Sequence, residues 1–295
     1  MSPLLKATYR LAEQALARRV RKLHGDVLDA SGRAQTLTPL LVPTITQADL
    51  VVALMDFVAG DGRELAWEGT RPPKLHSAHS SAGLALNTFA RWRLQPGSLF
   101  IERESRFATL RFEEKLPVFD SALGAPNLDL ALRRESQGIF AIESKLTEFL
   151  RPKTAQFAER YKAVVAGLAS PGWLVRYEEL RANTERFSFL DGAQLIKHYL
   201  GIKRAVFRDG GSAPLATLSY LYWEPADADL WPEFSAHRAE VAAFADGLND
   251  QQVHFVAICY RDLWDSWHRA DDGPLRRHVE ALRARYDVRL DEFAS

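Results

Sequence analysis

The sequence predicts a mixed α/β fold. From residue 80 onward, segments with helical spacing alternate with apolar, β-rich runs in the order α-β-β-β-α-(α)-β-α-β-α. No linker interrupts this order, and 295 residues, 47% of them hydrophobic, are enough to bury a large core. We therefore expect one α/β domain over residues 71–295, preceded by a helical extension over residues 1–70.

The extension is predicted to hold two helices. Over residues 3–24 the apolar positions are spaced by three and four, which is typical of an amphipathic helix. The opposite face of this helix is basic and carries Arg10, Arg18, Arg21 and Lys22. Such a face is either simply solvated or in contact with phosphates. A second helix is expected over residues 46–59, with Thr46 as its N-cap and the Gly-Asp-Gly at 60–62 as its end.

The remaining elements follow from periodicity and turn residues. A hairpin is indicated by two apolar runs joined by the polar turn 134–138. Pro171 is expected to stop the helix before it, and Asp191 to cap the next one. The predicted helices are 80–94, 153–169, 189–208, 235–248 and 274–286, and the predicted strands are 107–119, 127–133, 139–147, 213–225 and 252–264.

Composition excludes several classes of protein. Lys plus Arg and Asp plus Glu both number 38, so the overall charge gives no support for a nucleic-acid partner, and any such case must rest on local patches. The single cysteine, Cys259, rules out an internal disulfide and a cysteine-based zinc site. No apolar run approaches the roughly 20 residues that span a bilayer, and the charged N-terminus does not resemble a signal peptide. We expect a cytoplasmic protein without a membrane partner.

The predicted hairpin brings three charged side chains together. Glu143 and Lys145 lie two residues apart on one strand and therefore share a face. Folding about residue 136 places Asp129, on the preceding strand, opposite or diagonal to Glu143. Two carboxylates so placed repel unless one is protonated or a cation lies between them. A hard divalent cation is the natural partner, and the main-chain carbonyl of Ser144 would add a further oxygen ligand.

A metal, two carboxylates and an ammonium group suit phosphodiester hydrolysis. The lysine would orient the attacking water or stabilise the charge that develops in the transition state. Glu-x-Lys alone is a weak signal, since Glu113-Glu114-Lys115 repeats it without an acidic strand before it. The competing interpretation is a surface hairpin whose charges are solvated or ion-paired.

At these residues the sequence resembles a known superfamily. The segments "HSSAGLALNTF", "GAPNLDLAL" and "FAIESKLTEFL" resemble bacterial restriction endonucleases of the PD-(D/E)XK superfamily, over residues 76–265. The resemblance implies an αβββαβ core with a restriction-endonuclease-like mixed central sheet flanked by helices. It also implies a Mg²⁺-dependent DNA endonuclease, in which Mn²⁺ can substitute. Asp129 and Glu143 would bind the metal and Lys145 would position the water, leaving a 5′-phosphate and a 3′-hydroxyl.

Two positions depart from the superfamily pattern. The nearest proline, Pro126, lies three residues before the acid rather than next to it, and Ala82 stands where a polar helix residue is expected. Ala82 and the neutral net charge favour an alternative, namely a catalytically inactive module of the same fold that binds nucleic acid or a protein partner. A third interpretation is a metal-dependent enzyme acting on RNA.

Several further residues are candidates around this site. Glu113 and Glu114 are adjacent on a strand and point to opposite faces of the sheet, so only one of them would supply a third carboxylate to the metal site. Glu148 would reach this site only if the chain bends after the strand. Helix 189–208 carries a polar stripe that either tracks a phosphate backbone or is solvated, formed by Gln194, Lys197, Arg204 and Arg208. Because double-strand cleavage needs two sites, a homodimer is also expected.

Overall fold

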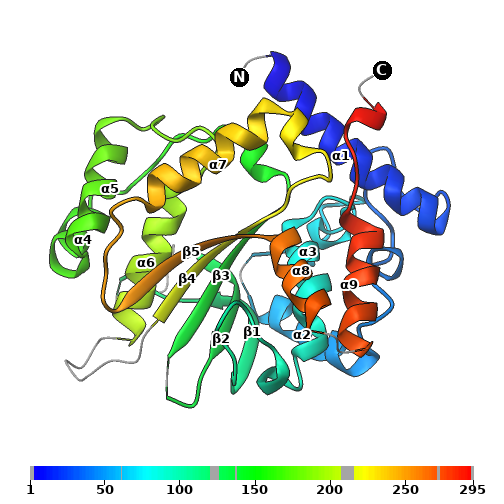
Figure 1. Cartoon of the computed structure of the whole chain (residues 1–295), viewed down its shortest axis with the longest axis horizontal. Coiled ribbons are helices and arrows are strands. Elements are labelled where there is room, and N and C mark those ends of the chain that lie inside the picture. Colours follow the sequence, from blue (N-terminus) through cyan, green and yellow to red (C-terminus); the bar gives the residue numbers. More distant parts are fainter. Residues whose placement is uncertain are drawn as a thin grey trace.

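A five-stranded mixed sheet forms the centre of the computed structural model, which describes residues 3–60, 62–119, 126–136, 138–206, 216–270 and 273–293. The strand order is β1-β2-β3-β4-β5. The first three strands pair antiparallel, and β3, β4 and β5 pair parallel (Figure 1). The strands are β1 Thr109–Lys115, β2 Asn127–Arg133, β3 Ile139–Lys145, β4 Ala216–Tyr222 and β5 Val253–Cys259.

Helices cover both faces of this sheet. In the described part of the chain they are α1 Pro3–His24, α2 Gln47–Ala59, α3 Ser81–Phe89, α4 Tyr161–Leu168, α5 Pro171–Ala182, α6 Gly192–Val206, α7 Pro232–Ala245, α8 Tyr260–Arg269 and α9 Gly273–Tyr286. The α/β fold with a mixed sheet is thereby confirmed, and its order is that of a restriction-endonuclease-like fold.

The side chains on the two faces of β3 pack against different helices. Phe140 and Ile142 belong to the core cluster formed with α3, α8 and α9, while Ile139 and Ala141 belong to the cluster formed with α4, α5 and α6. Because side chains alternate along a strand, Glu143 continues the α6-facing set. Every residue of β3 is buried, so charged side chains at its end need partners within the protein.

The hairpin is predicted correctly from the sequence. Strand β2 has the expected bounds, and the turn centres on residue 136 because Leu130 pairs with Ile142 and Arg133 with Ile139. The helices of the extension are also confirmed, including the cap at Thr46, whose side chain accepts a hydrogen bond from the Asp49 amide.

Several predicted elements are wrong in extent, and the strand expected over 107–119 covers only Thr109–Lys115. Residues 153–160 are not helical. Helix α4 ends at Leu168, before Pro171 as expected, and Pro171 itself begins α5, since its missing N–H costs nothing in a first turn. The run 252–264 is strand only to Cys259, and α8 begins at Tyr260. The helix expected over 80–94 ends at Phe89 and continues as the 3₁₀ turn Ala90–Trp92.

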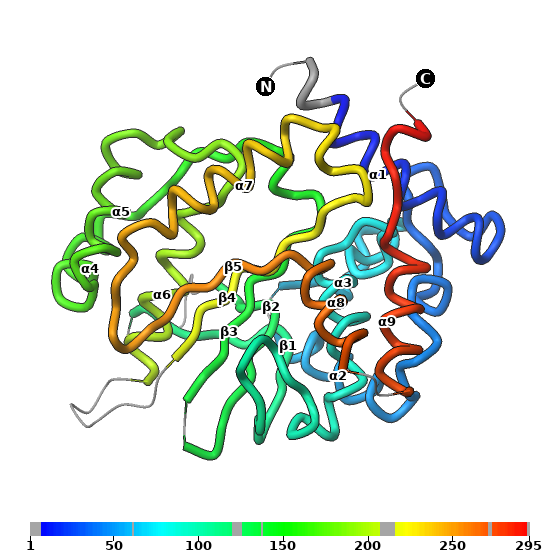
Figure 2. The backbone as a smooth tube through the Cα atoms, viewed as in Figure 1, coloured from blue at the N-terminus to red at the C-terminus, as the bar shows by residue number. Residues whose placement is uncertain are grey.

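The first 70 residues pack directly on the rest of the chain. Asp56 of α2 accepts two hydrogen bonds from the Arg93 guanidinium (2.7 and 2.9 Å) and one from the Phe112 amide (3.2 Å). Arg19 of α1 donates to the carbonyls of Ala284 and Asp287, and the C-terminal segment runs back beside α1 (Figure 2). The boundary at residue 70 stays a prediction.

Candidate active site

Asp129 lies where strands β2 and β3 cease to pair. The last paired residues are Leu130 and Ile142, and beyond them the carboxylate of Asp129 accepts a hydrogen bond from the Ser144 amide at 2.7 Å. The N–H and C=O of one strand residue point to the same neighbouring strand. The Ser144 carbonyl therefore faces the same side as Asp129.

Glu143 and Lys145 lie together on the α6 face of β3. The Lys145 ammonium donates to Oε1 of Glu143 and, at 3.1 Å, to Oε1 of Gln194. The second carboxylate oxygen of Glu143 lies 2.8 Å from Nε2 of His198, and both of these side chains are almost fully excluded from solvent. Gln194 and His198 are four residues apart on α6, so a single helical face holds both members of the Glu-x-Lys pair.

Burial and neighbouring charges shift the pKa values of these side chains in different directions. Burial, and then the negative charge of Glu143, raise the pKa of Asp129 well above its ordinary value. Burial would raise the pKa of Glu143 too, but Lys145 and His198 outweigh it and lower that pKa to about 2. Burial opposes the charged form of Lys145, yet Glu143 and then Asp129 raise its pKa. Without a bound cation, burial and the charge of Glu143 therefore favour the neutral form of Asp129, whereas Glu143 and Lys145 each favour the charged form of the other.

Glu113 is the third carboxylate of the region. In the β1–β2 ladder it falls between the pairs Phe112–Leu130 and Glu114–Leu128, and so lies across from Asp129. Its backbone has a φ of 53°, rare for a residue other than glycine, and its carboxylate accepts a hydrogen bond from the Asn127 amide group at 2.9 Å. Burial raises its pKa to about 7. Glu114, by contrast, is ion-paired with Arg133.

Glu148 is held by the main chain at the end of β3. The chain bends there into a 3₁₀ turn, Glu148–Leu150, and the Glu148 carboxylate accepts hydrogen bonds from the amides of Leu146 (2.9 Å) and Thr147 (3.0 Å). It thus caps the strand end, and it also lines the pocket that contains Lys145, whose pKa its negative charge helps to raise.

The basic stripe predicted on α6 is largely engaged within the protein. Lys197 lies over the rings of Phe157 and Tyr161, with its ammonium 5.7 and 5.9 Å from their centres, and burial lowers its pKa. Arg204 donates to the Val118 carbonyl at 2.9 Å. Arg208 lies outside the described residues. A role for these residues in nucleic-acid binding stays a prediction.

His198 is the residue of this site that sequence reasoning missed. A signal was present, since His198 follows Gln194 by one helical turn and Gln194 was already a candidate. Buried histidines are common, however, and only the packing of α6 on β3 identifies Glu143 as the partner.

The donor set suits a hard cation such as Mg²⁺. Asp129, Glu143 and the Ser144 carbonyl offer only oxygen, and a cation between the carboxylates would replace the proton that Asp129 otherwise needs. The described residues contain no group of three or more His, Cys, Asp or Glu side chains arranged to hold a metal. A cation here would therefore rely on the main-chain oxygen and keep several waters, as Mg²⁺ usually does.

Comparison with known proteins agrees with this fold. The mixed sheet and the helices on its two faces define a restriction-endonuclease-like protein. A family model described as restriction endonuclease associating with ARP matches residues 10–287, and the chain belongs to that family. No curated protein and no solved structure gives a significant match. Within the described residues, none of the helices is both long and apolar enough to cross a membrane.

Proposed function

We propose that this protein is a Mg²⁺-dependent DNA endonuclease with a PD-(D/E)XK-type site. The observation that carries the proposal is the cluster at the end of β3. There the buried Glu143 and Lys145 lie beside Asp129, whose carboxylate accepts a hydrogen bond from the Ser144 amide. Membership of a restriction-endonuclease family supports nuclease chemistry and DNA as the substrate.

Asp129, Glu143 and the main-chain oxygen of Ser144 would hold the Mg²⁺. Bound there, the ion neutralises phosphate charge and makes a water more acidic. Lys145, kept as an ammonium by the two carboxylates, donates to the attacking water or to the phosphate oxygens and stabilises the charge of the transition state. As an ammonium it cannot also act as the base.

The residues around this cluster act by positioning. Gln194 fixes the ammonium of Lys145, and His198 fixes the second oxygen of Glu143. Glu113 is the accessory carboxylate that we favour, because it lies across from Asp129, whereas Glu114 is ion-paired with Arg133. Mn²⁺, which has similar ligand preferences, is expected to substitute for Mg²⁺.

Cleavage of supercoiled plasmid with Mg²⁺ tests the proposal. Lys145→Met should lower the rate by about 10²- to 10³-fold, the usual cost of losing a transition-state donor. Lys162→Met, which removes an exposed lysine of α4, is the matched control and should cut as the parent does. Equal cleavage by parent and Lys145→Met would refute the assigned site.

An inactive binding module of the same fold is the second candidate. It is favoured by Ala82, which brings no polar side chain to the first turn of α3. This turn lies close to the site, because the carbonyl of the neighbouring Ser81 accepts a hydrogen bond from Ser144 Oγ at 3.4 Å. Calorimetry with Mn²⁺ separates the two: heat of binding that Asp129→Asn abolishes supports the nuclease. DNA binding without any metal binding supports the module.

A further inference from the structure

One face of α1 lines a long surface groove. Arg10, Gln14, Arg18 and Arg21 follow one another by four, four and three positions, so they form a single stripe. At 1.5 Å per residue the stripe extends over roughly 16 Å, the length of about five phosphates along one DNA strand. The opposite wall is the loop of small residues Ala30, Ser31 and Gly32, which leaves room for a bulky backbone.

The acidic groups of this region are already paired. Glu13 accepts a hydrogen bond from the Tyr9 hydroxyl, and its Oε1 lies 3.0 Å from Nε2 of His79. Asp29 accepts hydrogen bonds from the amides of Ser31 (2.8 Å) and Arg33 (2.9 Å). Asp26 lies 3.5 Å from Nε of Arg21 and offsets its charge, so the positive charge that the groove offers to an incoming ligand rests on Arg10 and Arg18.

A basic side chain connects the groove to the candidate active site. Arg151 lines the pocket that contains Lys145, and its side chain is 59% exposed. Its guanidinium lies 3.9 Å from the centre of the Tyr9 ring and 4.0 Å from Glu13, which lines the α1 groove. Arg151 thus joins the pocket that contains Lys145 to the groove along α1, and it meets the groove at Glu13.

We propose that this groove binds the sugar–phosphate backbone of duplex DNA flanking the cleavage site, an inference that rests on the function proposed above. Guanidinium groups bind phosphates in a bidentate manner, and a linear array of them suits a linear polyanion. An anionic membrane is a poorer ligand for α1. Its apolar residues Ala12, Leu16 and Val20 are fully buried in the core, so the middle of the helix has no apolar face to insert.

The salt dependence of DNA binding tests this inference. The probe is a fluorescent duplex of about 30 base pairs, titrated in EDTA to prevent cleavage and followed by anisotropy. Loss of two phosphate contacts in Arg10→Ala/Arg18→Ala should reduce the slope of log K against log salt by about 2. A fourfold rise in salt would then cost this variant about tenfold less affinity than it costs the parent.

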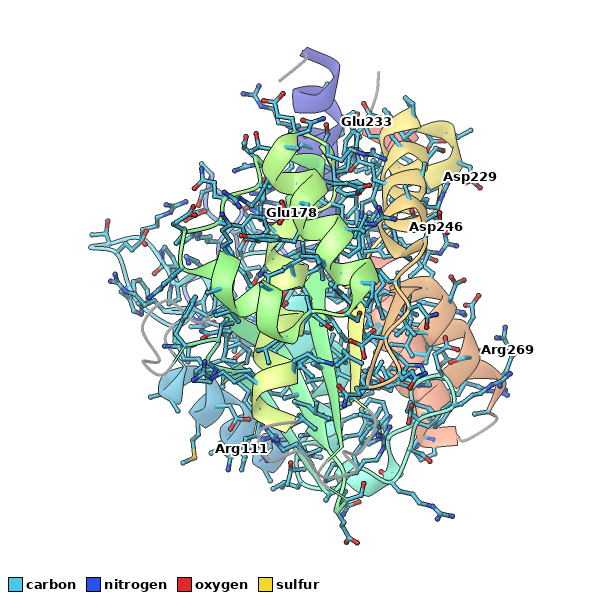
Figure 3. The ribbon with its side chains drawn as sticks, turned by 90° about the vertical axis from the view of Figure 1, so that its left-hand side faces the viewer. Arg111, Glu178, Asp229, Glu233, Asp246 and Arg269 are labelled. Carbon is cyan, nitrogen blue, oxygen red and sulfur yellow. The ribbon has the colours of Figure 1, made fainter. Side chains whose placement is uncertain are left out.

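The matched control removes two exposed arginines elsewhere. Arg269 points outward at the end of α8 (Figure 3), and Arg277 is exposed on α9. Arg269→Ala/Arg277→Ala should keep the parent slope. Because Arg18 lies over the Phe293 ring, a second variant guards against misfolding. Arg10→Glu changes an exposed residue without a hydrogen bond or ion pair to the described residues, and it should weaken binding to DNA of any sequence.

The outcomes separate this inference from the function on which it rests. If the parent does not bind the duplex, both the proposed function and the groove assignment fail. If the parent binds and the two double variants have equal slopes, only the groove assignment fails. Loss of binding to phosphatidylserine vesicles in Arg10→Ala/Arg18→Ala, with DNA binding intact, would also overturn it.

Discussion

His198 of α6 and Glu143 of β3 meet through Nε2 and Oε2 at 2.8 Å, in a part of the protein from which water is almost excluded. Lys145 occupies the other carboxylate oxygen. Glu143 therefore has the Lys145 ammonium at one oxygen and the His198 ring at the other, and these two neighbours lower its pKa to about 2 despite its burial. Helix α6 thus holds Glu143 and Lys145 in place, although none of its residues is among the metal ligands proposed above.

Replacement of His198 by alanine should destabilise the protein by about 1–3 kcal/mol, because a buried oxygen of Glu143 loses its neighbour. Urea unfolding of parent and variant measures this difference. His198→Gln, whose amide can donate to the same oxygen, is the control and should recover part of the loss. Equal stabilities for the parent and His198→Ala would mean that this contact contributes nothing.

Glu113→Gln should stabilise the protein at high pH. With a pKa of about 7, against an ordinary 4.5, the folded chain holds the Glu113 proton more tightly than the unfolded chain does. The stabilisation from this group is therefore fully present below about pH 4.5 and is lost as pH rises through 7. The glutamine does not titrate, so the variant should exceed the parent by up to about 3 kcal/mol at pH 8, with no gain near pH 4.5. Unfolding at the two pH values checks this, and a gain independent of pH would contradict it.

The hairpin was predictable because all the local signals agree. The polar turn over 134–138, which contains Gly138, places the turn centre at residue 136, and the observed pairing of Leu130 with Ile142 agrees with it. The charged residues stood out because they interrupt strands that are otherwise apolar.

Elsewhere the local signals were ambiguous. The run ending in Trp264 is apolar enough for a buried strand, yet Tyr260, Trp264 and Trp267 have helical spacing and pack in the core from α8. Pro171 can end one helix or begin the next, and only the tertiary structure decides. The contact between His198 and Glu143 joins residues 55 positions apart, so no local pattern could reveal it.

Gly60→Ala should destabilise the protein through Glu113. A Cβ at Gly60 would lie 2.6 Å from the Cβ of Glu113, an atom close to the backbone that cannot move aside cheaply. We expect a cost of about 1–3 kcal/mol, typical of overpacking. Gly167→Ala in α4 is the matched control, since nothing lies within 4 Å of its Cβ and alanine favours a helix. Thermal unfolding of the two variants should shift in opposite directions, and a neutral Gly60→Ala would show that Glu113 has room to move.

His237 should make the protein sensitive to acid. It is completely buried, stacks on Phe149 at 4.1 Å, and its Nε2 lies 2.9 Å from the Tyr220 hydroxyl. Burial, and then the charge of Arg238, lower its pKa to about 3 from an ordinary 6.5. Between these two pKa values His237 is protonated in the unfolded chain but not in the folded one. The free energy of unfolding therefore decreases as pH falls, by about 1.4 kcal/mol per pH unit.

His237→Gln, which does not titrate and can still accept from Tyr220, should remove this part of the pH slope. Urea unfolding between pH 6 and about pH 3 measures it, and parallel slopes for parent and variant would contradict the assignment. His278, whose pKa burial lowers to about 4, gives an internal comparison. His278→Gln should flatten the same curve, but its effect should end about one pH unit earlier on the acid side, because its folded-state pKa is closer to the ordinary value.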